Sequence, residues 1–439
     1  MASHLSTSEE FSKPAQEAAR ITVKRNRSYL SILTLVVSIF ILGWFVYDEA
    51  VLSISDVKFH MANTYISIFT DADVSVGKNM QPVAEDVGDC DVFNGNWVLD
   101  DIRYPLYREE NCEFMSTQFS CMKNGRKDDT YQKWRWQPRN CMLPRFDARR
   151  LLSQLTGKRL MFVGDSLHRN QWESMVCLLQ SGATNKSVIR DGSITAFHIF
   201  DYNATVEFYW APFLVESNSD NPRMHSILDR IIKPDSIHKH GVHWKGVDYL
   251  VFNSYIWWMN TSKMKVLKGE SFDEESTEYD EILRPTAYER VIRTWANWVD
   301  QNIDSNVTSV FFNSMSPIHY RSEDWNGSNG TNCAMETKPI LNVTGLPPTG
   351  TDKRLLEVVE NVTESMRMPV RILNITTLSE YRKDAHASVY TIRQGELLSP
   401  EQQADPMKYA DCIHWCLPGL PDTWNELLYT KIVSSRLDN

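Results

Sequence analysis

A serine lies between a short apolar run and a helical pattern. The run 160–163 ends at Gly164, Asp165 and Ser166, and apolar side chains then recur at the spacing of one helix face: Trp172, Met175, Val176 and Leu179. Glycine permits a sharp turn, and free backbone N–H groups at a helix start favour negative charge. The pattern predicts a serine nucleophile beside donors for an oxyanion. The alternative is that Asp165 or Ser166 only caps the helix.

A serine nucleophile needs a base, and the base needs a group that orients it. Asp411 and His414 offer both, three residues apart, in the stretch DCIHWC. Residues at this spacing share a face of a helical turn, and they can also meet in a tight loop. Asp411 would then accept the Nδ1–H of His414 and leave Nε2 for Ser166. The alternative for His414 is a structural histidine held by hydrogen bonds.

A second Asp/His pair competes for this role. Asp384 and His386 lie together in YRKDAHASVY. We favour Asp411 and His414, because this pair precedes a helical pattern near the chain end and because neighbouring cysteines can hold it rigidly.

The elements that must position these residues alternate from Lys158 onward. Short apolar runs predict buried strands at 160–163, 249–252, 309–312 and 370–373. Helical periods occupy 285–303 and 352–366. Such alternation favours a parallel sheet covered by helices on both faces. Ligands bind at the carboxyl ends of the strands in these sheets, which is where Ser166 is expected.

A membrane signal precedes the folded part of the 439-residue chain. Residues 29–47 are apolar and uncharged, about the length that crosses a bilayer. Basic residues precede the stretch and acidic residues follow it. The positive-inside rule therefore predicts a cytosolic tail at 1–28, a transmembrane signal anchor at 29–47, a stem or linker at 48–89 and a lumenal catalytic domain at 90–439. A cleaved signal peptide is the alternative.

All eight cysteines follow this stretch, which fits an oxidising compartment and disulfides of unknown pairing. They are Cys90, Cys112, Cys121, Cys141, Cys177, Cys333, Cys412 and Cys416. Because four of them crowd together with turn signals, we expect an irregular, disulfide-tied segment at 90–157 before an α/β core at 158–439.

Sequons for N-glycosylation also follow the apolar stretch and favour the secretory pathway. They lie at Asn185, Asn203, Asn260, Asn306, Asn326, Asn329, Asn342, Asn361 and Asn374. The net charge of −10 gives no reason to expect nucleic acid as a partner. No His/Cys pattern with metal-ligand spacing predicts a metal site.

Two stretches carry a family resemblance. GDSLHRNQWESMVCLL and DCIHWCLPGLPDTWNELLY, in this order, are similar to the paired signatures of the plant trichome birefringence-like family, whose members resemble GDSL/SGNH esterases. The resemblance includes CDVFNGNWV and WRWQPRNC and runs from about Cys90 to the end. It implies an SGNH-hydrolase-like three-layer α/β/α fold with a central parallel sheet. It also implies a single-pass type II protein of the Golgi membrane.

The resemblance assigns roles to residues. Ser166 matches the family nucleophile, and Asp411 and His414 match its Asp-x-x-His pair. Arg169 and Asn170 match the Arg-Asn that follows the nucleophile.

Two further positions are compared with the wider family. Asn253 is the counterpart of an asparagine that supports the oxyanion hole in SGNH enzymes. His168 departs from the asparagine that many members carry beside the nucleophile.

The family acetylates cell-wall polysaccharides, and residues 202–220 are similar to members that act on xylan. The resemblance implies transfer through an acetyl-serine to xylosyl O2 or O3, with acetyl-CoA or an acetylated intermediate as co-substrate and no bound cofactor. The oligomeric state is open. Alternatives are an acetyl esterase on wall polysaccharide, an acetyltransferase on mannan, xyloglucan or pectin, and a non-catalytic glycan-binding protein. Sugar-stacking walls are predicted at Tyr209, Trp210, Trp257 and Trp258, whose alternative is a place in the core.

Overall fold

The computed structural model describes residues 90–224, 227, 229–269, 272, 278–328, 330–341 and 350–434. The predicted cytosolic tail, signal anchor and stem lie outside these residues. Within the described part of the chain, no helix is both long and apolar enough to cross a membrane.

Seven strands form the central sheet, in the order β13-β12-β9-β3-β6-β5-β4. Five of them run parallel: β3 (Arg159–Gly164), β6 (Ala204–Trp210), β9 (Tyr249–Phe252), β12 (Ser309–Asn313) and β13 (Val370–Leu373). The four apolar runs found in the sequence are thus confirmed as strands. Their carboxyl ends meet at one edge of the sheet, so the turn after β3 lies beside the loops after β9 and β12.

The prediction of a parallel central sheet is wrong at one side, where the sheet is mixed. β4 (Lys186–Asp191) and β5 (Ile194–Ile199) are antiparallel to each other, and β5 is antiparallel to β6. Short turns join these strands, with positive φ at Gly192 (55°) and Asn203 (47°). Such short connections join antiparallel neighbours, because a parallel pair needs a long crossover.

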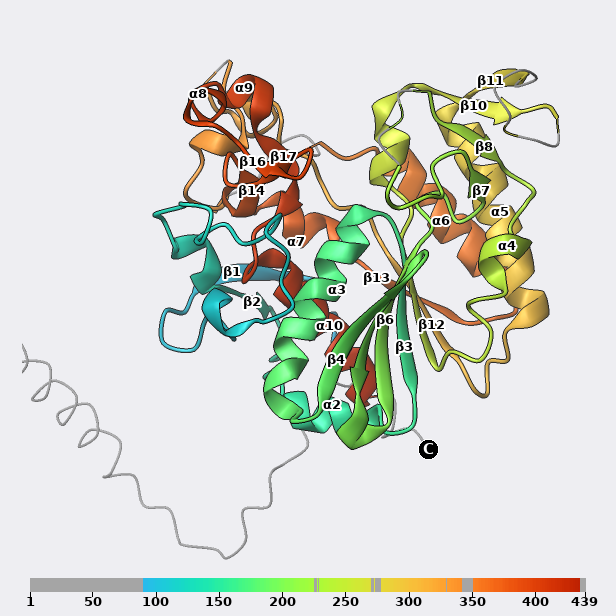
Figure 1. Ribbon diagram of the computed structural model, residues 1–439, viewed down its shortest axis with the longest axis horizontal. Helices are drawn as coiled ribbons and strands as arrows, with labels where there is room; N and C mark the ends of the chain where they lie inside the picture. The colour runs from blue at the N-terminus through green and yellow to red at the C-terminus, as the bar shows by residue number, and fades with distance from the viewer. Residues whose placement is uncertain are drawn as a thin grey trace, which may run out of the picture. The chain divides into compact units, whose positions relative to one another are not determined.

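Helices cover both faces of the sheet (Figure 1). On one face lie α2 (Ala148–Gln154), α3 (Ser166–Leu179) and α10 (Leu420–Ser434), and Trp172 of α3 packs 6.5 Å from Phe208 of β6. On the other lie α5 (Arg284–Asn302) and α6 (Lys353–Glu364), and Trp295 of α5 packs 5.3 Å from Phe252 of β9. Both helical periods seen in the sequence are confirmed. Burying one such large apolar side chain stabilises the fold by about 2 kcal/mol.

Two groups of smaller elements lie on opposite sides of the carboxyl edge (Figure 1). One group comprises a four-stranded sheet and a short helix: β7 (Glu216–Ser217), β8 (Ile231–Lys233), β10 (Lys263–Leu267), β11 (Tyr279–Leu283) and α4 (His238–Gly241). The other comprises two strand pairs and three short helices: β14 (His386–Ser388), β17 (Asp411–Trp415), β15 (Ile392–Arg393), β16 (Glu396–Leu397), α7 (Thr376–Glu380), α8 (Pro400–Gln403) and α9 (Pro406–Tyr409).

Residues 90–141 form an irregular segment, whereas the segment expected from the sequence extended to residue 157, a stretch that includes α2. Its strands are β1 (Gly95–Leu99) and β2 (Trp134–Pro138), which pair antiparallel. All eight cysteines form disulfides: Cys90–Cys141, Cys112–Cys177, Cys121–Cys416 and Cys333–Cys412. Two of these bridges tie the segment to α3 and to the residue after β17, so this segment is anchored at both halves of the predicted site.

Candidate active site

The turn that carries Ser166 depends on a close approach between two strands. A Cβ atom added to Gly164 would lie 2.6 Å from the carbonyl oxygen of Asn253, so only glycine lets β3 end here. Asp165 is the N-cap of α3, and its carboxylate accepts the N–H of Leu167 at 3.0 Å. Ser166 is therefore the first residue of the helix, at the carboxyl edge of the sheet.

The structure brings the three predicted site residues together. His414 Nε2 lies 2.7 Å from Ser166 Oγ, and His414 Nδ1 lies 2.7 Å from Asp411 Oδ2. Because a carboxylate only accepts hydrogen bonds, Nδ1 carries the hydrogen and Nε2 is free to accept the serine proton. The side chains of His414 and Asp411 are 14% and 17% exposed, which leaves the imidazole accessible to a substrate.

Asp411 and His414 meet on a strand, neither on a helical turn nor in a loop. In a regular strand, residues three apart point to opposite faces. Here Asp411 Oδ1 accepts the backbone N–H groups of Ile413 at 3.0 Å and His414 at 2.9 Å, and this local turn folds the carboxylate toward the imidazole. The pairing of β17 with β14 is irregular at the same place.

The charge of Asp411 is strongly stabilised. Burial acts to raise its pKa, but the charge and hydrogen bonds of His414 and the N–H of Ile413 outweigh this effect and hold the pKa well below its ordinary value. Asp411 therefore stays ionised at neutral and mildly acidic pH. A permanent carboxylate fixes the tautomer of His414 and stabilises the imidazolium that forms when His414 accepts a proton.

Asn170 joins the two halves of the site. Its side-chain oxygen accepts the N–H of Trp415 at 2.8 Å, and its side-chain nitrogen donates to the carbonyl of Trp415 at 3.2 Å. Asn170 is fully buried, one turn along the helix from Ser166. The two hydrogen bonds hold β17 against α3. The residue after Trp415 is Cys416, which is fixed by its disulfide with Cys121. Asn170 thus positions the imidazole and does not contact the reacting atoms.

Asn253 lies next to Asp165, and the role predicted for it is wrong. When the side-chain amide is oriented so that its nitrogen faces Asp165, that nitrogen lies 2.9 Å from both carboxylate oxygens and donates to them, so it is not turned toward an oxyanion. Asp165 also accepts the N–H groups of Tyr255 and Ile256. Burial raises the pKa of Asp165, although these N–H groups oppose the rise. Asp165 and Asn253 support the turn below the serine.

Arg169 connects the turn to the irregular N-terminal segment. Its guanidinium lies 5.3 Å from the ring centre of Phe119 and donates to Gln118 Oε1. The Phe119 ring lies 5.9 Å from the imidazole of His414. Phe119 and Gln118 were not identified from the sequence, because neither has a motif or a spacing that relates it to residues beyond position 400.

His168, where the chain departs from many relatives, is a structural residue. Its Nδ1–H donates to the carbonyl of Val163 at 2.9 Å, and burial lowers its pKa to about 3. The ring is therefore neutral, and it supports the end of β3.

The competing pair, Asp384 and His386, lies behind the site. Asp384 forms a buried ion pair with Arg382 at 3.0 Å. His386 Nδ1 lies 3.1 Å from the carbonyl oxygen of His414, and its ring stacks 3.7 Å from Trp415. His386 thus supports the strand that carries the base. Asp384 does not contact His386 as an orienting carboxylate would.

Comparison with known proteins shows the family. The family model described as PC-Esterase, the GDSL/SGNH-like acyl-esterase family found in Pmr5 and Cas1p, matches residues 143–431. The chain belongs to this PC-Esterase family. The model of the PMR5 N-terminal domain matches residues 88–142, which include the irregular segment beside His414.

Three similar proteins from two plants illustrate the relationship of this PC-Esterase chain. Xylan O-acetyltransferase 4 of Oryza sativa subsp. japonica is 49% identical over 418 residues, 93% of this chain and 86% of the relative. Xylan O-acetyltransferase 6 of the same rice is 60% identical over 352 residues, 79% of this chain, and the chain spans 63% of its length. Protein trichome birefringence-like 3 of Arabidopsis thaliana is 48% identical over 349 residues, 79% of this chain and 80% of the relative.

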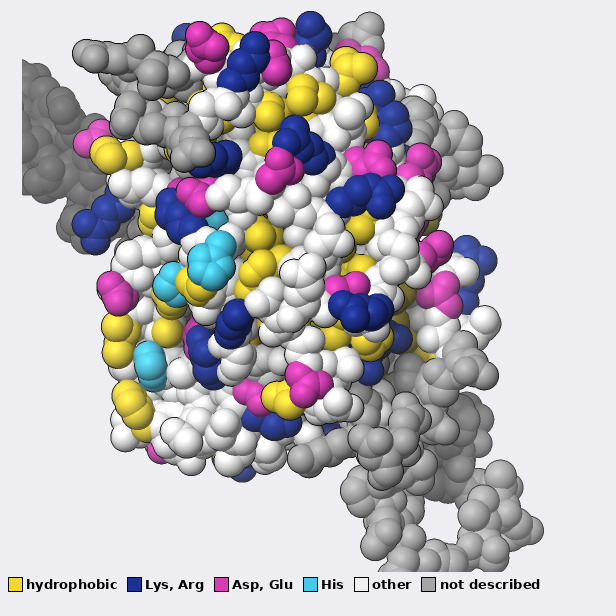
Figure 2. All heavy atoms as spheres, turned by 90° about the vertical axis from the view of Figure 1, so that its right-hand side faces the viewer, with side chains coloured by type: hydrophobic (Ala, Val, Ile, Leu, Met, Phe, Trp, Pro, Cys, Tyr) yellow, Lys and Arg dark blue, Asp and Glu magenta, His cyan; other side chains and the backbone are white. Residues whose placement is uncertain are grey.

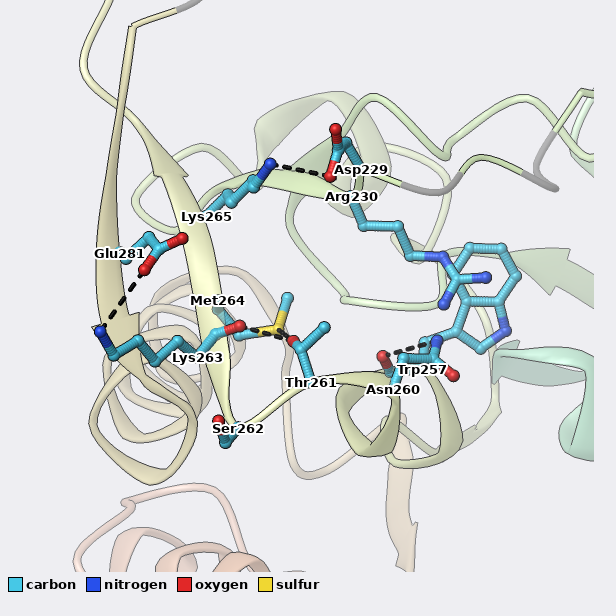
Figure 3. A pocket seen from close by; sticks show the side chains of 10 residues that line it. All are labelled: Asp229, Arg230, Trp257, Asn260, Thr261, Ser262, Lys263, Met264, Lys265 and Glu281. Atoms are coloured by element: carbon cyan, nitrogen blue, oxygen red, sulfur yellow. Dashed lines mark hydrogen bonds and ion pairs between the residues drawn. The ribbon is translucent and has the colours of Figure 1, made fainter.

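The aromatic residues predicted to stack on sugars are core residues of the PC-Esterase domain. Exposed fractions are 7% or less for Tyr209, Trp210, Trp257 and Trp258. The guanidinium of Arg230 lies 3.8 Å from the ring centre of Trp257, in a pocket of about 250 Å³ (Figure 3). The prediction is wrong because protein groups already cover the ring faces that a sugar would need.

The predicted glycosylation sites are mostly at the surface. Six of the asparagines are exposed, Asn374 is half-buried, and two lie outside the described residues; the exposed ones are Asn185, Asn203, Asn260, Asn306, Asn326 and Asn361. The two outside are Asn329 and Asn342. An exposed asparagine satisfies the steric need of a glycan, and occupancy stays a prediction.

Charged side chains of both signs alternate on the face that carries α4 and α5 (Figure 2). A phosphate backbone binds to a continuous basic patch. Among the described residues, this face presents no such patch. In the part of the chain described, no group of three His, Cys, Asp or Glu residues is arranged to hold a metal ion.

Proposed function

We propose that this protein is an O-acetyltransferase that moves an acetyl group through Ser166 onto xylosyl hydroxyls of cell-wall xylan. The observation that carries the proposal is the pair of 2.7 Å contacts that join Ser166, His414 and Asp411. The names of the rice relatives, xylan O-acetyltransferases at 49–60% identity, support xylan as the acceptor.

The first half-reaction acetylates the serine. His414 Nε2 takes the proton of Ser166 while Oγ bonds to the carbonyl carbon of the acetyl donor. Negative charge develops on the carbonyl oxygen, beside the backbone N–H of Ser166 at the helix start. The tetrahedral intermediate then collapses, the bond to the donor's leaving group breaks, and His414 returns the proton to that group. The donor is acetyl-CoA or an acetylated intermediate.

The second half-reaction delivers the acetyl group. The O2 or O3 hydroxyl of a xylosyl residue gives its proton to His414 Nε2 while its oxygen bonds to the acetyl carbon. The bond from that carbon to Ser166 Oγ then breaks, and Oγ takes the proton from His414. The enzyme is regenerated, and Asp411 stabilises the imidazolium in both halves.

The sequence and the disulfides support a location that is part of the proposal. The apolar stretch at 29–47 anchors the chain in the Golgi membrane as a type II protein, with residues 90–439 in the lumen. Four disulfides among the described residues suit the lumen, since they would be reduced in the cytosol.

Acetyl-ester hydrolysis is the second candidate, because the matching family model is described as an acyl-esterase family. Water in place of the sugar hydroxyl would complete the same chemistry. The two functions differ in which acceptor reaches the acetyl-serine first.

The test is to incubate the purified chain with xylo-oligosaccharide and acetyl-CoA and to measure acetyl-modified oligosaccharide by mass spectrometry. Ser166→Ala and His414→Ala should each lose about ten-thousandfold or more in rate. Ser181→Ala, at an exposed serine, is the matched control. Normal transfer by Ser166→Ala refutes the mechanism. Transfer to mannan or pectin but not to xylan refutes the acceptor only, and acetate release without transfer favours the esterase.

A further inference from the structure

A pocket of about 450 Å³ opens at the carboxyl edge of the central sheet. Its walls come from the loops after β9 and β12 and from the starts of α5 and α6: Met259, Ile318, Tyr320, Arg321, Asp324, Arg284, Gly350, Thr351, Asp352 and Arg354. The volume is in the range of small-molecule sites in proteins. The pocket could not be predicted from the sequence, because these residues come from four separate segments.

Two tyrosines connect this pocket to the catalytic residues. The backbone N–H of His319 donates to the carbonyl of Cys412 at 3.1 Å, so the neighbouring residue Tyr320, which lines the pocket, lies close to the strand that carries Asp411. Burial raises the pKa of Tyr320 to about 12, and the charge of Asp411 adds to the rise. The backbone N–H of Tyr255 donates to Asp165, next to Ser166, and the Tyr255 hydroxyl accepts the N–H of Asp352 at 3.0 Å in the pocket wall. Hydrogen bonds thus link the pocket wall to the segments that carry Asp165 and Asp411.

The pocket offers an aromatic surface that the core aromatics do not. Tyr320 is 38% exposed, and Met259 and Ile318 add apolar surface. A sugar ring presents apolar C–H groups on its face, which pack on an exposed aromatic ring. In the smaller pocket of Figure 3, by contrast, Arg230 already covers the face of Trp257.

The charges of the pocket suit hydroxyl groups better than an anion. Arg284 and Arg354 each contact Asp352 at 2.7 Å, and Arg321 contacts Asp324 at 3.1 Å. Each guanidinium in the pocket contacts a carboxylate, although Arg284 and Arg354 share Asp352, so two carboxylates offset most of the charge of three arginines and weaken the attraction for a further anion. Ion pairs at a pocket wall still present N–H donors and oxygen acceptors, and sugar hydroxyls need both.

We propose that this pocket binds the acceptor, a neutral chain of pentose residues, with Tyr320 as the platform for one sugar ring. This inference rests on the proposed transferase function and explains how a sugar hydroxyl competes with water. Residues of the chain bound in the pocket hold the reacting hydroxyl near the acetyl-serine, and this proximity raises its effective concentration far above that of a free sugar. Tyr320 and Arg321 are positioning residues for the acceptor.

The experiment uses the full chain in detergent and three variants: Tyr320→Ala, Arg321→Ala and Tyr320→Phe. Binding of xylohexaose is measured by titration calorimetry without donor, and transfer and acetate release are measured with acetyl-CoA. Tyr320→Ala and Arg321→Ala should each weaken binding about three- to tenfold, raise the KM for xylohexaose equally, and lower the ratio of transfer to hydrolysis. Tyr320→Phe keeps the ring and should restore binding. Arg293→Ala, at an exposed ion-paired arginine of α5, should change nothing.

The outcomes separate this inference from the proposed function. Transfer by the wild type with unchanged binding in Tyr320→Ala and Arg321→Ala overturns the pocket assignment and leaves the transferase intact. A raised KM for acetyl-CoA in place of xylohexaose also overturns it, because the pocket would then hold the donor. Binding that depends on Tyr320 without any transfer by the wild type supports the pocket and refutes the transferase. Because Arg321 is mostly exposed, its variant keeps the test valid if Tyr320→Ala fails to fold.

Discussion

Asn170→Ala tests whether the two halves of the site are held together by one buried amide. The wild-type side chain accepts the N–H of Trp415 at 2.8 Å and donates to its carbonyl at 3.2 Å. Alanine removes both hydrogen bonds and leaves two buried backbone groups of β17 without their partner. The Cys121–Cys416 bridge stays, so the strand is loosened and not released.

The magnitude follows from these two groups. A buried polar group that loses its partner costs about 1–3 kcal/mol, so the variant should lose about 3 kcal/mol of stability. For a domain of this size, that loss lowers the unfolding temperature by about 4 °C. Because His414 directly precedes Trp415, a shift of β17 moves its imidazole away from Ser166. A displacement of about 1 Å lowers the rate about a hundredfold.

The assay combines thermal unfolding with acetyl transfer measured well below the unfolding temperature. Asn302→Ala is the matched control, since Asn302 makes one side-chain hydrogen bond to a helical carbonyl, that of Trp298, at 2.9 Å. We expect Asn302→Ala to transfer at the wild-type rate. If Asn170→Ala unfolds at a lower temperature but keeps full activity while folded, then β17 does not need Asn170 for its position, and the reasoning is refuted.

Three further results are expected. Burial raises the pKa of Glu426 from 4.5 to about 8. Between these values the unfolded chain has lost a proton that the folded chain keeps, so the free energy of unfolding falls as the pH rises. Glu426→Gln should therefore raise the unfolding temperature at pH 8 but not at pH 4.5, and equal shifts at both pH values would contradict this reasoning. Replacing Cys121 and Cys416 by serine removes a disulfide that links positions 295 residues apart and should lower the free energy of unfolding by about 5 kcal/mol. The variant should unfold at a lower temperature than the wild type, and reducing agent should lower its unfolding temperature less than that of the wild type. His386→Ala removes a hydrogen bond to the carbonyl of His414 and should lower kcat about tenfold with little change in KM, whereas a raised KM alone would place His386 in substrate binding.

Local patterns in the sequence predicted much of the framework. The runs at β3, β9 and β12 are identifiable because strands buried on both faces are apolar nearly throughout, whereas β13 lies at the edge of the sheet and carries an exposed Arg371. The turn at Gly164 and Ser166 is equally local, since glycine and an N-cap aspartate are required where a strand passes directly into a helix. The antiparallel strands β4 and β5 were missed, because β4 lies at the edge with exposed polar residues and β5 beside it mixes polar and apolar residues without a clear period.

Other features depend on where the chain goes after it leaves each element. Asn253 is a plausible oxyanion donor until the structure places Asp165 against its amide, and Trp258 is a plausible sugar platform until the core covers it. The fate of a polar or aromatic side chain is decided by its neighbours, and sequence spacing does not reveal neighbours from distant segments.

The sequence by itself determined which groups are available for chemistry: a hydroxyl at a helix start, and an imidazole within reach of a carboxylate. Only the tertiary structure decided that these groups meet, across 248 residues of chain, and that the pocket beside them is lined by Tyr320. The physical reason is that residue types and local turns depend on short-range sterics and hydrogen bonds. The distance between remote segments depends instead on how the whole core packs, here with a sheet, a buried asparagine and disulfides acting together.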